Sequence, residues 1–134
     1  MTSKVVYLGD LRTENVHLKS GDIFKTDAPT DNNGKGEAFS PTDTVATALA
    51  SCMLTVMGIK ARDLDLDIKD ANAEVTKTMA SNPRRISKIE IKVNLPFTFD
   101  TKFKKILEHT AKTCPVFHSL HPDMILNISF NWES

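Results

Sequence analysis

Two cysteines, Cys52 and Cys114, are the residues of this sequence best suited to do chemistry. They are too far apart in the chain to form a CxxC redox pair or a zinc ribbon by spacing. One interpretation is that both are buried thiols that act as small hydrophobic residues, because cysteine is among the most buried residue types. The other is that at least one is reactive, which requires the thiolate form.

A reactive Cys52 would need a cation from elsewhere in the fold. An unassisted thiol with a pKa of about 8.5 is only about 3% thiolate at pH 7. Cys52 lies about 18 Å along its predicted helix from the N-cap Ser40, at about 1.5 Å per residue. The helix dipole fades within the first turn, so it cannot act on this thiol. The composition alone does not choose the cation.

The helix that carries Cys52 has a clear start in the sequence. Ser40 is a suitable N-cap, Pro41 fits the first helical position, and Asp43 completes an approximate capping box. The helix is predicted to continue to about Lys60. Its apolar residues recur at helical spacing: Val45, Leu49, Cys52, Met53 and Val56. Since the other face has only Ala, Thr and Ser, the helix should be covered on nearly all sides, by a dimer partner or by a second layer of the monomer.

Strands are predicted on both sides of this helix. Before it, the pattern indicates short strands at Lys4–Tyr7, Asn15–Leu18 and Asp22–Lys25, followed by a loop over residues 27–36. After it, Glu74–Thr78 should pair with Ile89–Leu95, and Leu126–Trp132 should form a final strand. The sequence therefore predicts an α+β domain with an antiparallel sheet.

A second helix is predicted to begin near Asp100, with Cys114 at or just beyond its end. Pro115 disfavours helical geometry at the residue before it, which is Cys114. The second cysteine is therefore expected at a helix end.

Length and charge limit the kind of protein. The chain has 134 residues, which fits a single domain over 1–134, and 17 basic residues balance 17 acidic ones. A net charge of zero argues against nucleic-acid binding and against attraction to a membrane surface. The apolar stretch Thr44–Ile59 is too short for a confident membrane span, and Met1–Tyr7 is typical of a strand rather than a signal peptide. We therefore expect a cytoplasmic protein with reduced thiols.

The segments around both cysteines resemble the OsmC/Ohr superfamily, in its OsmC-like branch. Residues 40–52, SPTDTVATALASC, are similar to the Ser-Pro-x-Glu…Ala-Leu-x-x-Cys helix of OsmC-like proteins. Residues 114–120, CPVFHSL, are similar to the Cys-Pro segment of that family, and they follow in the expected order. The resemblance implies the OsmC-like fold, in which antiparallel sheets wrap around two central helices of an intertwined homodimer.

The resemblance also implies an activity, the thiol-dependent reduction of hydroperoxides with a preference for organic ones. Cys52 matches the peroxidatic cysteine, which forms a sulfenic acid, and Cys114 the resolving cysteine, which closes a disulfide with it. Arg12 matches the activating arginine of the N-terminal hairpin by position. Asp43 matches the partner carboxylate, where the family usually has Glu. An external thiol, either a small thiol or a lipoylated protein, would restore the enzyme, and no cofactor or metal is implied.

Other interpretations of the site residues stay open. Arg12 could be a solvated hairpin charge, with Arg84, Arg85 or His118 supplying the cation instead. Asp43 could be only a helix N-terminal carboxylate, with Glu37 as the partner of the arginine.

Two other classes of function also stay open. Cys114, His118 and His121 could bind zinc together with Cys52. The chain could instead be a non-catalytic protein that binds a small molecule or an acyl chain. Met53, Met57 and Phe117 would line the apolar pocket for such a ligand or for an alkyl peroxide, unless they are core residues.

Overall fold

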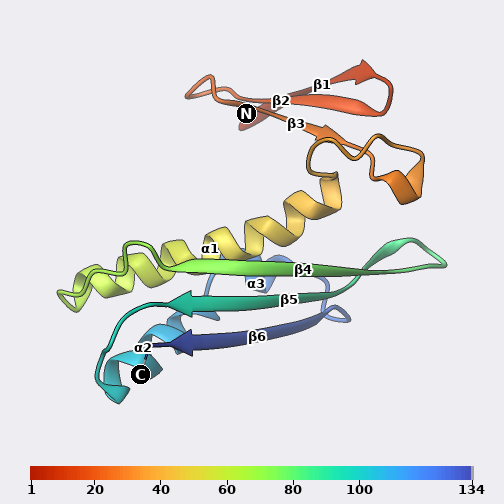
Figure 1. Cartoon of the computed structure of the whole chain (residues 1–134). Coiled ribbons are helices and arrows are strands. Elements are labelled where there is room, and N and C mark those ends of the chain that lie inside the picture. The colour runs from red at the N-terminus through yellow and green to blue at the C-terminus, as the bar shows by residue number, and fades with distance from the viewer. Residues whose placement is uncertain (134) are drawn as a thin grey trace. The chain divides into compact units, whose positions relative to one another are not determined.

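The structure is a computed structural model that describes residues 1–133 (Figure 1). The chain divides into two compact units. The first is Met1–Val45 and the second begins at Ala46. The division falls within one helix, α1 (Pro41–Asp63), whose first turns belong to the first unit and whose remainder belongs to the second.

The first unit is a three-stranded antiparallel sheet followed by a loop. Its strands β1 (Ser3–Gly9), β2 (Arg12–His17) and β3 (Ile23–Asp27) pair in the order β1-β2-β3 (Figure 1). A short 3-10 helix, η1 (Thr30–Asn32), follows in the predicted loop. β2 begins three residues earlier than predicted, because Asp10 and Leu11 both take positive φ and turn the chain tightly. Arg12 therefore lies on a strand.

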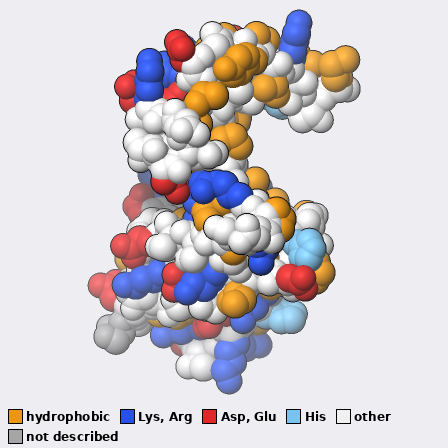
Figure 2. Space-filling model, turned by 90° about the vertical axis from the view of Figure 1, so that its right-hand side faces the viewer, with side chains coloured by type: hydrophobic (Ala, Val, Ile, Leu, Met, Phe, Trp, Pro, Cys, Tyr) orange, Lys and Arg blue, Asp and Glu red, His pale blue; other side chains and the backbone are white. Residues whose placement is uncertain are grey.

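Much of the apolar surface of this first unit is exposed. Val5 and Tyr7 on β1, and Ile23 and Phe24 on β3, are each more than half exposed. Figure 2 shows hydrophobic side chains, in orange, at the surface of this unit. A soluble monomer rarely exposes so many large apolar side chains on one small sheet.

Helix α1 begins with the capping box that the sequence predicts. The amide of Asp43 donates to Ser40 Oγ at 3.0 Å, and the amide of Ser40 donates to Asp43 Oδ2 at 3.0 Å. Each side chain thus satisfies a backbone donor of the other residue at the helix start. The helix continues three residues beyond the predicted end at Lys60.

The second unit places helices next to a three-stranded sheet. Its strands are β4 (Asn72–Ala80), β5 (Arg85–Leu95) and β6 (Ile125–Trp132), paired in the order β4-β5-β6. Between β5 and β6 lie α2 (Thr101–Ala111) and α3 (Pro115–Ser119).

One strand pair corrects the sequence-based prediction of an antiparallel sheet. β4 and β5 are antiparallel, but β5 and β6 are parallel. The physical reason is the connection, since α2 and α3 carry the chain back to the start of β5 before β6 begins. Such a crossover joins parallel neighbours, whereas a tight turn joins antiparallel ones.

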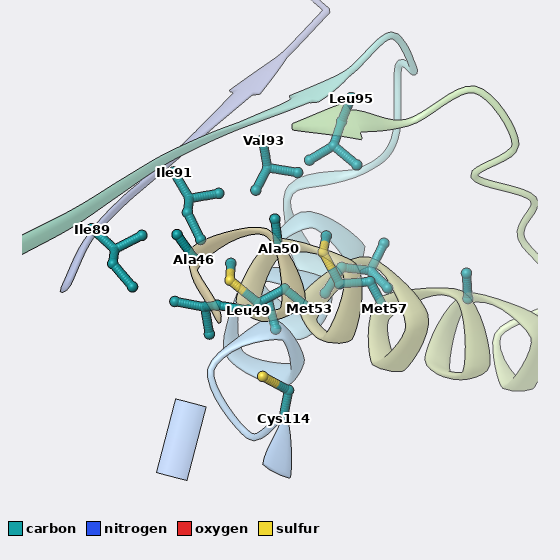
Figure 3. Close-up of a cluster of buried hydrophobic side chains, with 13 residues drawn as sticks. Ala46, Leu49, Ala50, Met53, Met57, Ile89, Ile91, Val93, Leu95 and Cys114 are labelled. Atoms are coloured by element: carbon teal, nitrogen blue, oxygen red, sulfur yellow. The ribbon is translucent and has the colours of Figure 1, made fainter. Parts of the chain in front are cut away.

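The core of the second unit lies between α1 and β5. Four β5 side chains point toward α1 in Figure 3: Ile89, Ile91, Val93 and Leu95. The buried positions of α1 are Ala46, Leu49, Ala50, Met53, Met57 and Ala61. This face differs from the predicted one, because Val45 is exposed and Cys52 and Val56 are only partly buried. Small residues, Ala46, Ala50 and Ala61, contribute to the buried face, and a pattern of large apolar residues alone does not include them.

Helix α1 is also long and apolar enough to cross a membrane by length and composition alone. The central helix of a globular core passes the same test. In this chain Leu49, Met53 and Met57 are fully buried in the core, which accounts for the apolar composition of the helix.

Candidate functional site

Both cysteines lie in the second unit as free thiols. Cys52 is on α1 and is partly exposed, whereas Cys114 is completely buried. Cys52 packs against the same hydrophobic cluster that contains Cys114. Residues from two distant parts of the sequence are thus brought to one place by the core.

Cys114 occupies the N-cap of α3. It lies beyond the end of α2, as the following proline predicts, and Pro115 takes the first position of α3. Its Sγ accepts a hydrogen bond from the amide of Phe117 at 3.3 Å. A sulfur in the place usually taken by a Ser or Asp oxygen fixes the thiol at this turn.

Burial raises the pKa of the Cys114 thiol above its ordinary value, and interaction with the neighbouring Cys52 thiol raises it further. The amides of Phe117 and Val116 act in the opposite direction but do not outweigh the burial. Cys114 therefore stays a protonated thiol at neutral pH. Cys52 contributes to this raised pKa as a neighbour of Cys114 in the same unit.

Arg12 is held by two carboxylates of the first unit. Its Nε donates to Asp27 Oδ1 at 2.7 Å and its Nη2 donates to Asp27 Oδ2 at 2.9 Å. Nη2 also donates to Glu37 Oε2 at 3.3 Å. The hydrogen bond to Asp27 is the main cause that raises the pKa of Arg12, and the same bond lowers the pKa of Asp27.

Asp27 was not anticipated as a site residue. The sequence pattern predicts Asp27 in a loop and Arg12 outside any strand, so it does not predict that the two residues pair. In the structure β2 and β3 extend far enough that Arg12 and Asp27 are directly opposite one another. The available signal was the spacing of two opposite charges across a short β-hairpin.

The other predicted carboxylate, Asp43, belongs to the start of α1, where it bonds the amide of Ser40. Among residues 1–133, no hydrogen bond or ion pair joins Asp43 to Arg12. Glu37, the alternative partner, does bond Arg12, through a side chain that is 66% exposed.

Arg85 and His118, the alternatives to Arg12 as the activating cation, have other contacts in the structure. Arg85 donates from Nη1 to the carbonyl oxygens of Ser81 and Pro83, both at 2.9 Å, and so closes the turn between β4 and β5. His118 is exposed, with its ring edge-on to Phe117.

A zinc site is the other alternative for the histidines. In the part of the chain that the structure describes, no three His, Cys, Asp or Glu residues gather to hold a metal ion.

The candidate pocket residues also have defined environments. Met53 and Met57 are fully buried in the hydrophobic cluster, as core residues are. Phe117 is partly buried and packs against the same cluster.

Known proteins are similar to this chain along most of its length. The sequence model of a family described as OsmC-like protein matches residues 34–129. A crystal structure of a candidate osmotic stress induced and detoxification response protein from Psychrobacter arcticus 273-4 is 55% identical, with a TM-score of 0.94. The match covers 97% of this chain and 95% of that one. No curated protein sequence matches this chain.

More distant structures share the fold. An organic hydroperoxide resistance protein OsmC from Legionella pneumophila is 13% identical, with a TM-score of 0.76 over 98% of this chain and 97% of that one. An OsmC like protein from Mycoplasma pneumoniae is 16% identical, with a TM-score of 0.82 over 98% and 96%. The mixed α+β fold expected from the resemblance is confirmed by these structures.

Proposed function

The chain belongs to the OsmC-like protein family, and from this premise we propose that it reduces organic hydroperoxides with its two cysteines. The observation that carries the proposal is that both free thiols lie in one unit, where Cys52 packs against the hydrophobic cluster that contains Cys114. The name of the Legionella pneumophila protein, an organic hydroperoxide resistance protein, supports the choice of substrate class.

In the first step, the Cys52 thiolate attacks one oxygen of the peroxide bond. The S–O bond forms as the O–O bond breaks, and the leaving alkoxide takes up a proton to become an alcohol. Cys52 is now a sulfenic acid, oxidised by two electrons. The partial exposure of Cys52 supports its assignment as the thiol that meets the substrate.

In the second step, Cys114 gives up its proton as its sulfur attacks the sulfenic sulfur. The proton and the sulfenic hydroxyl leave together as water, which gives a Cys52–Cys114 disulfide. A protonated, buried thiol next to Cys52 is suited to this role, because it does not compete for the peroxide. Two external thiol groups then reduce the disulfide by exchange, and they leave as a disulfide themselves. A small thiol or a lipoylated protein could donate them.

Arg12 and Asp43 are the other two residues to which we assign a role in the reaction. Arginine is charged at any relevant pH and its planar fork can bind a thiolate and a carboxylate together. We assign Arg12 the stabilisation of the reacting thiolate. Asp43 has the place of the family's carboxylate on the helix of Cys52, nine positions before it.

The active form is proposed to be a homodimer in the cytoplasm. The exposed apolar side chains of β1 and β3 support a dimer in which a second copy of the chain covers them, because exposing this much apolar surface to water is unfavourable. A reducing compartment is also the setting in which a thiol cycle is regenerated.

Mass spectrometry of the whole protein tests the proposal. The reduced chain receives one equivalent of cumene hydroperoxide and is measured before and after addition of dithiothreitol. Loss of two hydrogen atoms per chain, reversed by dithiothreitol, is the expected result. An unchanged mass with unconsumed peroxide would contradict the proposal. Thermal stabilisation by a fatty acid would then favour a binding protein.

A further inference from the structure

Asp27 is a buried carboxylate with three hydrogen-bond donors, and the proposed chemistry leaves it unused. It is 1% exposed, and its two oxygens accept from Arg12 Nε, from Arg12 Nη2 and from the amide of Glu37. Burying a carboxylate is costly unless charged donors and hydrogen bonds compensate for lost water. A buried charge with three directed donors therefore fixes the geometry of its partner.

We propose that Asp27 is the positioning residue for Arg12, holding one edge of its guanidinium so that the other edge is kept for the reacting anion. This inference rests on the proposed function, since the anion is the thiolate or the peroxide oxygen that Arg12 is assigned to stabilise.

The geometry of the guanidinium supports this division into two edges. Its Nε–Nη2 edge forms the paired contact with Asp27, and the second N–H of Nη2 points to Glu37. Among residues 1–133, no acceptor is hydrogen-bonded to Nη1. Arginine has five N–H donors, so the two on Nη1 stay available to an anion.

The backbone of Asp27 is fixed as well as its side chain. Its amide donates to the carbonyl of Phe39 at 3.0 Å, and the next amide, of Ala28, donates to the carbonyl of Leu11 at 3.1 Å. Leu11 directly precedes Arg12. The strand that carries the carboxylate is thus tied to the turn that directly precedes the arginine, and one cannot shift without the other.

Glu37 differs from Asp27 in what it can do. Its side chain is 66% exposed and its single contact with Arg12 is 3.3 Å long, so water competes for it. Its amide, however, donates to Asp27 Oδ2 at 3.1 Å. Glu37 therefore supports Asp27 through its backbone more than it holds Arg12 through its carboxylate.

A double-mutant cycle tests whether Asp27 acts through Arg12. The variants are Asp27→Asn, Arg12→Met and the double variant, with Asp22→Asn as the control. Asp22 is an exposed aspartate of the same unit, outside the Arg12 contacts. Two quantities are measured, the rate constant for consumption of cumene hydroperoxide and, in a Cys114→Ser background, the rate of Cys52 alkylation by iodoacetamide.

We expect Asp27→Asn to lower the peroxide rate constant by about tenfold or more, since a displacement of about 1 Å of a reacting group can cost ~100-fold. In the Arg12→Met background the same change should have no further effect, because there is no guanidinium left to position. Asp22→Asn should leave the rate constant at its original value.

Two results would overturn the inference: an unchanged rate constant in Asp27→Asn, or a full additional loss in the double variant. If Asp27→Asn is unfolded in its circular dichroism spectrum, Asp27→Glu replaces it in the same cycle under the same criteria. A wild-type chain that consumes no peroxide contradicts the proposed function instead. The alkylation rates then decide the role of Asp27 by the same comparison.

Discussion

Cys52 and Cys114 are neighbours with opposite exposure. Their thiols interact, yet Cys52 is partly exposed on α1, while Cys114 is fully buried at the start of α3. Burial raises the pKa of Cys114 and keeps it protonated. This difference in burial makes Cys52 accessible to a substrate and shields Cys114 from it, although Cys52 packs against the hydrophobic cluster that contains Cys114.

Replacing each cysteine in turn should separate the two roles. Cys52→Ser is expected to abolish peroxide consumption, because the attacking atom is lost. Cys114→Ser should complete one turnover and retain an added oxygen at Cys52, which further peroxide can overoxidise. Peroxide assays and intact-mass measurements of both variants check this. Equal residual activity in the two variants would contradict the assignment.

The protein in solution should have about twice the mass of one chain. The physical reason is the exposed apolar surface of the first unit, where Tyr7, Ile23 and Phe24 are all more than half exposed. Light scattering at micromolar concentration measures the mass directly. Phe24→Ser removes part of this apolar surface and should weaken the dimer. A folded monomer of the wild-type chain would contradict the prediction.

Much of the fold follows from local patterns. The start of α1 could be predicted because Ser40, Pro41 and Asp43 act within a single turn, and the structure has the bonds that they imply. The position of Cys114 after α2 follows from Pro115 in the same way. These signals depend on neighbours in sequence, so one chain is enough to read them.

What could not be predicted depends on residues far apart in sequence. The parallel pairing of β6 with β5 is set by the path of the intervening helices, and alternation of apolar residues looks the same in both orientations. The partner of Arg12 is set by strand register, and a shift of one residue would move Asp27 to the other face of the sheet. The local sequence pattern predicts neither the direction of a strand pair nor its register.

The capping box should contribute measurably to stability. In Ser40→Ala the amide of Asp43 loses its acceptor, and we expect a loss of about 1 kcal/mol in the free energy of unfolding. Ser40→Thr keeps a hydroxyl and is the matched control. Urea denaturation of the three proteins gives the values. No difference between Ser40→Ala and the wild type would show that the cap is not stabilising.

The Arg12–Asp27 ion pair predicts a specific response to acid. The pKa of Asp27 is lowered in the folded state, first by its hydrogen bond to Arg12. The stability it contributes is therefore present above its ordinary pKa of about 3.9 and is lost as the pH falls through the lower folded value. The stability difference between wild type and Asp27→Asn should shrink below about pH 4. Urea midpoints across this range measure it, and a constant difference would contradict the prediction.

The buried thiol of Cys114 should make the folded protein less stable at alkaline pH. Its pKa is raised in the folded state, mainly by burial, so the stability linked to its protonated form is complete below the ordinary value of about 8.5. That stability is lost as the pH rises through the higher folded value, because the unfolded chain gives up its proton first. Cys114→Ser does not titrate in this range, so its stability relative to wild type should improve above about pH 8.5. Urea denaturation with reductant present measures the two curves. Parallel curves would show that the buried thiol is not what makes the folded protein sensitive to alkali.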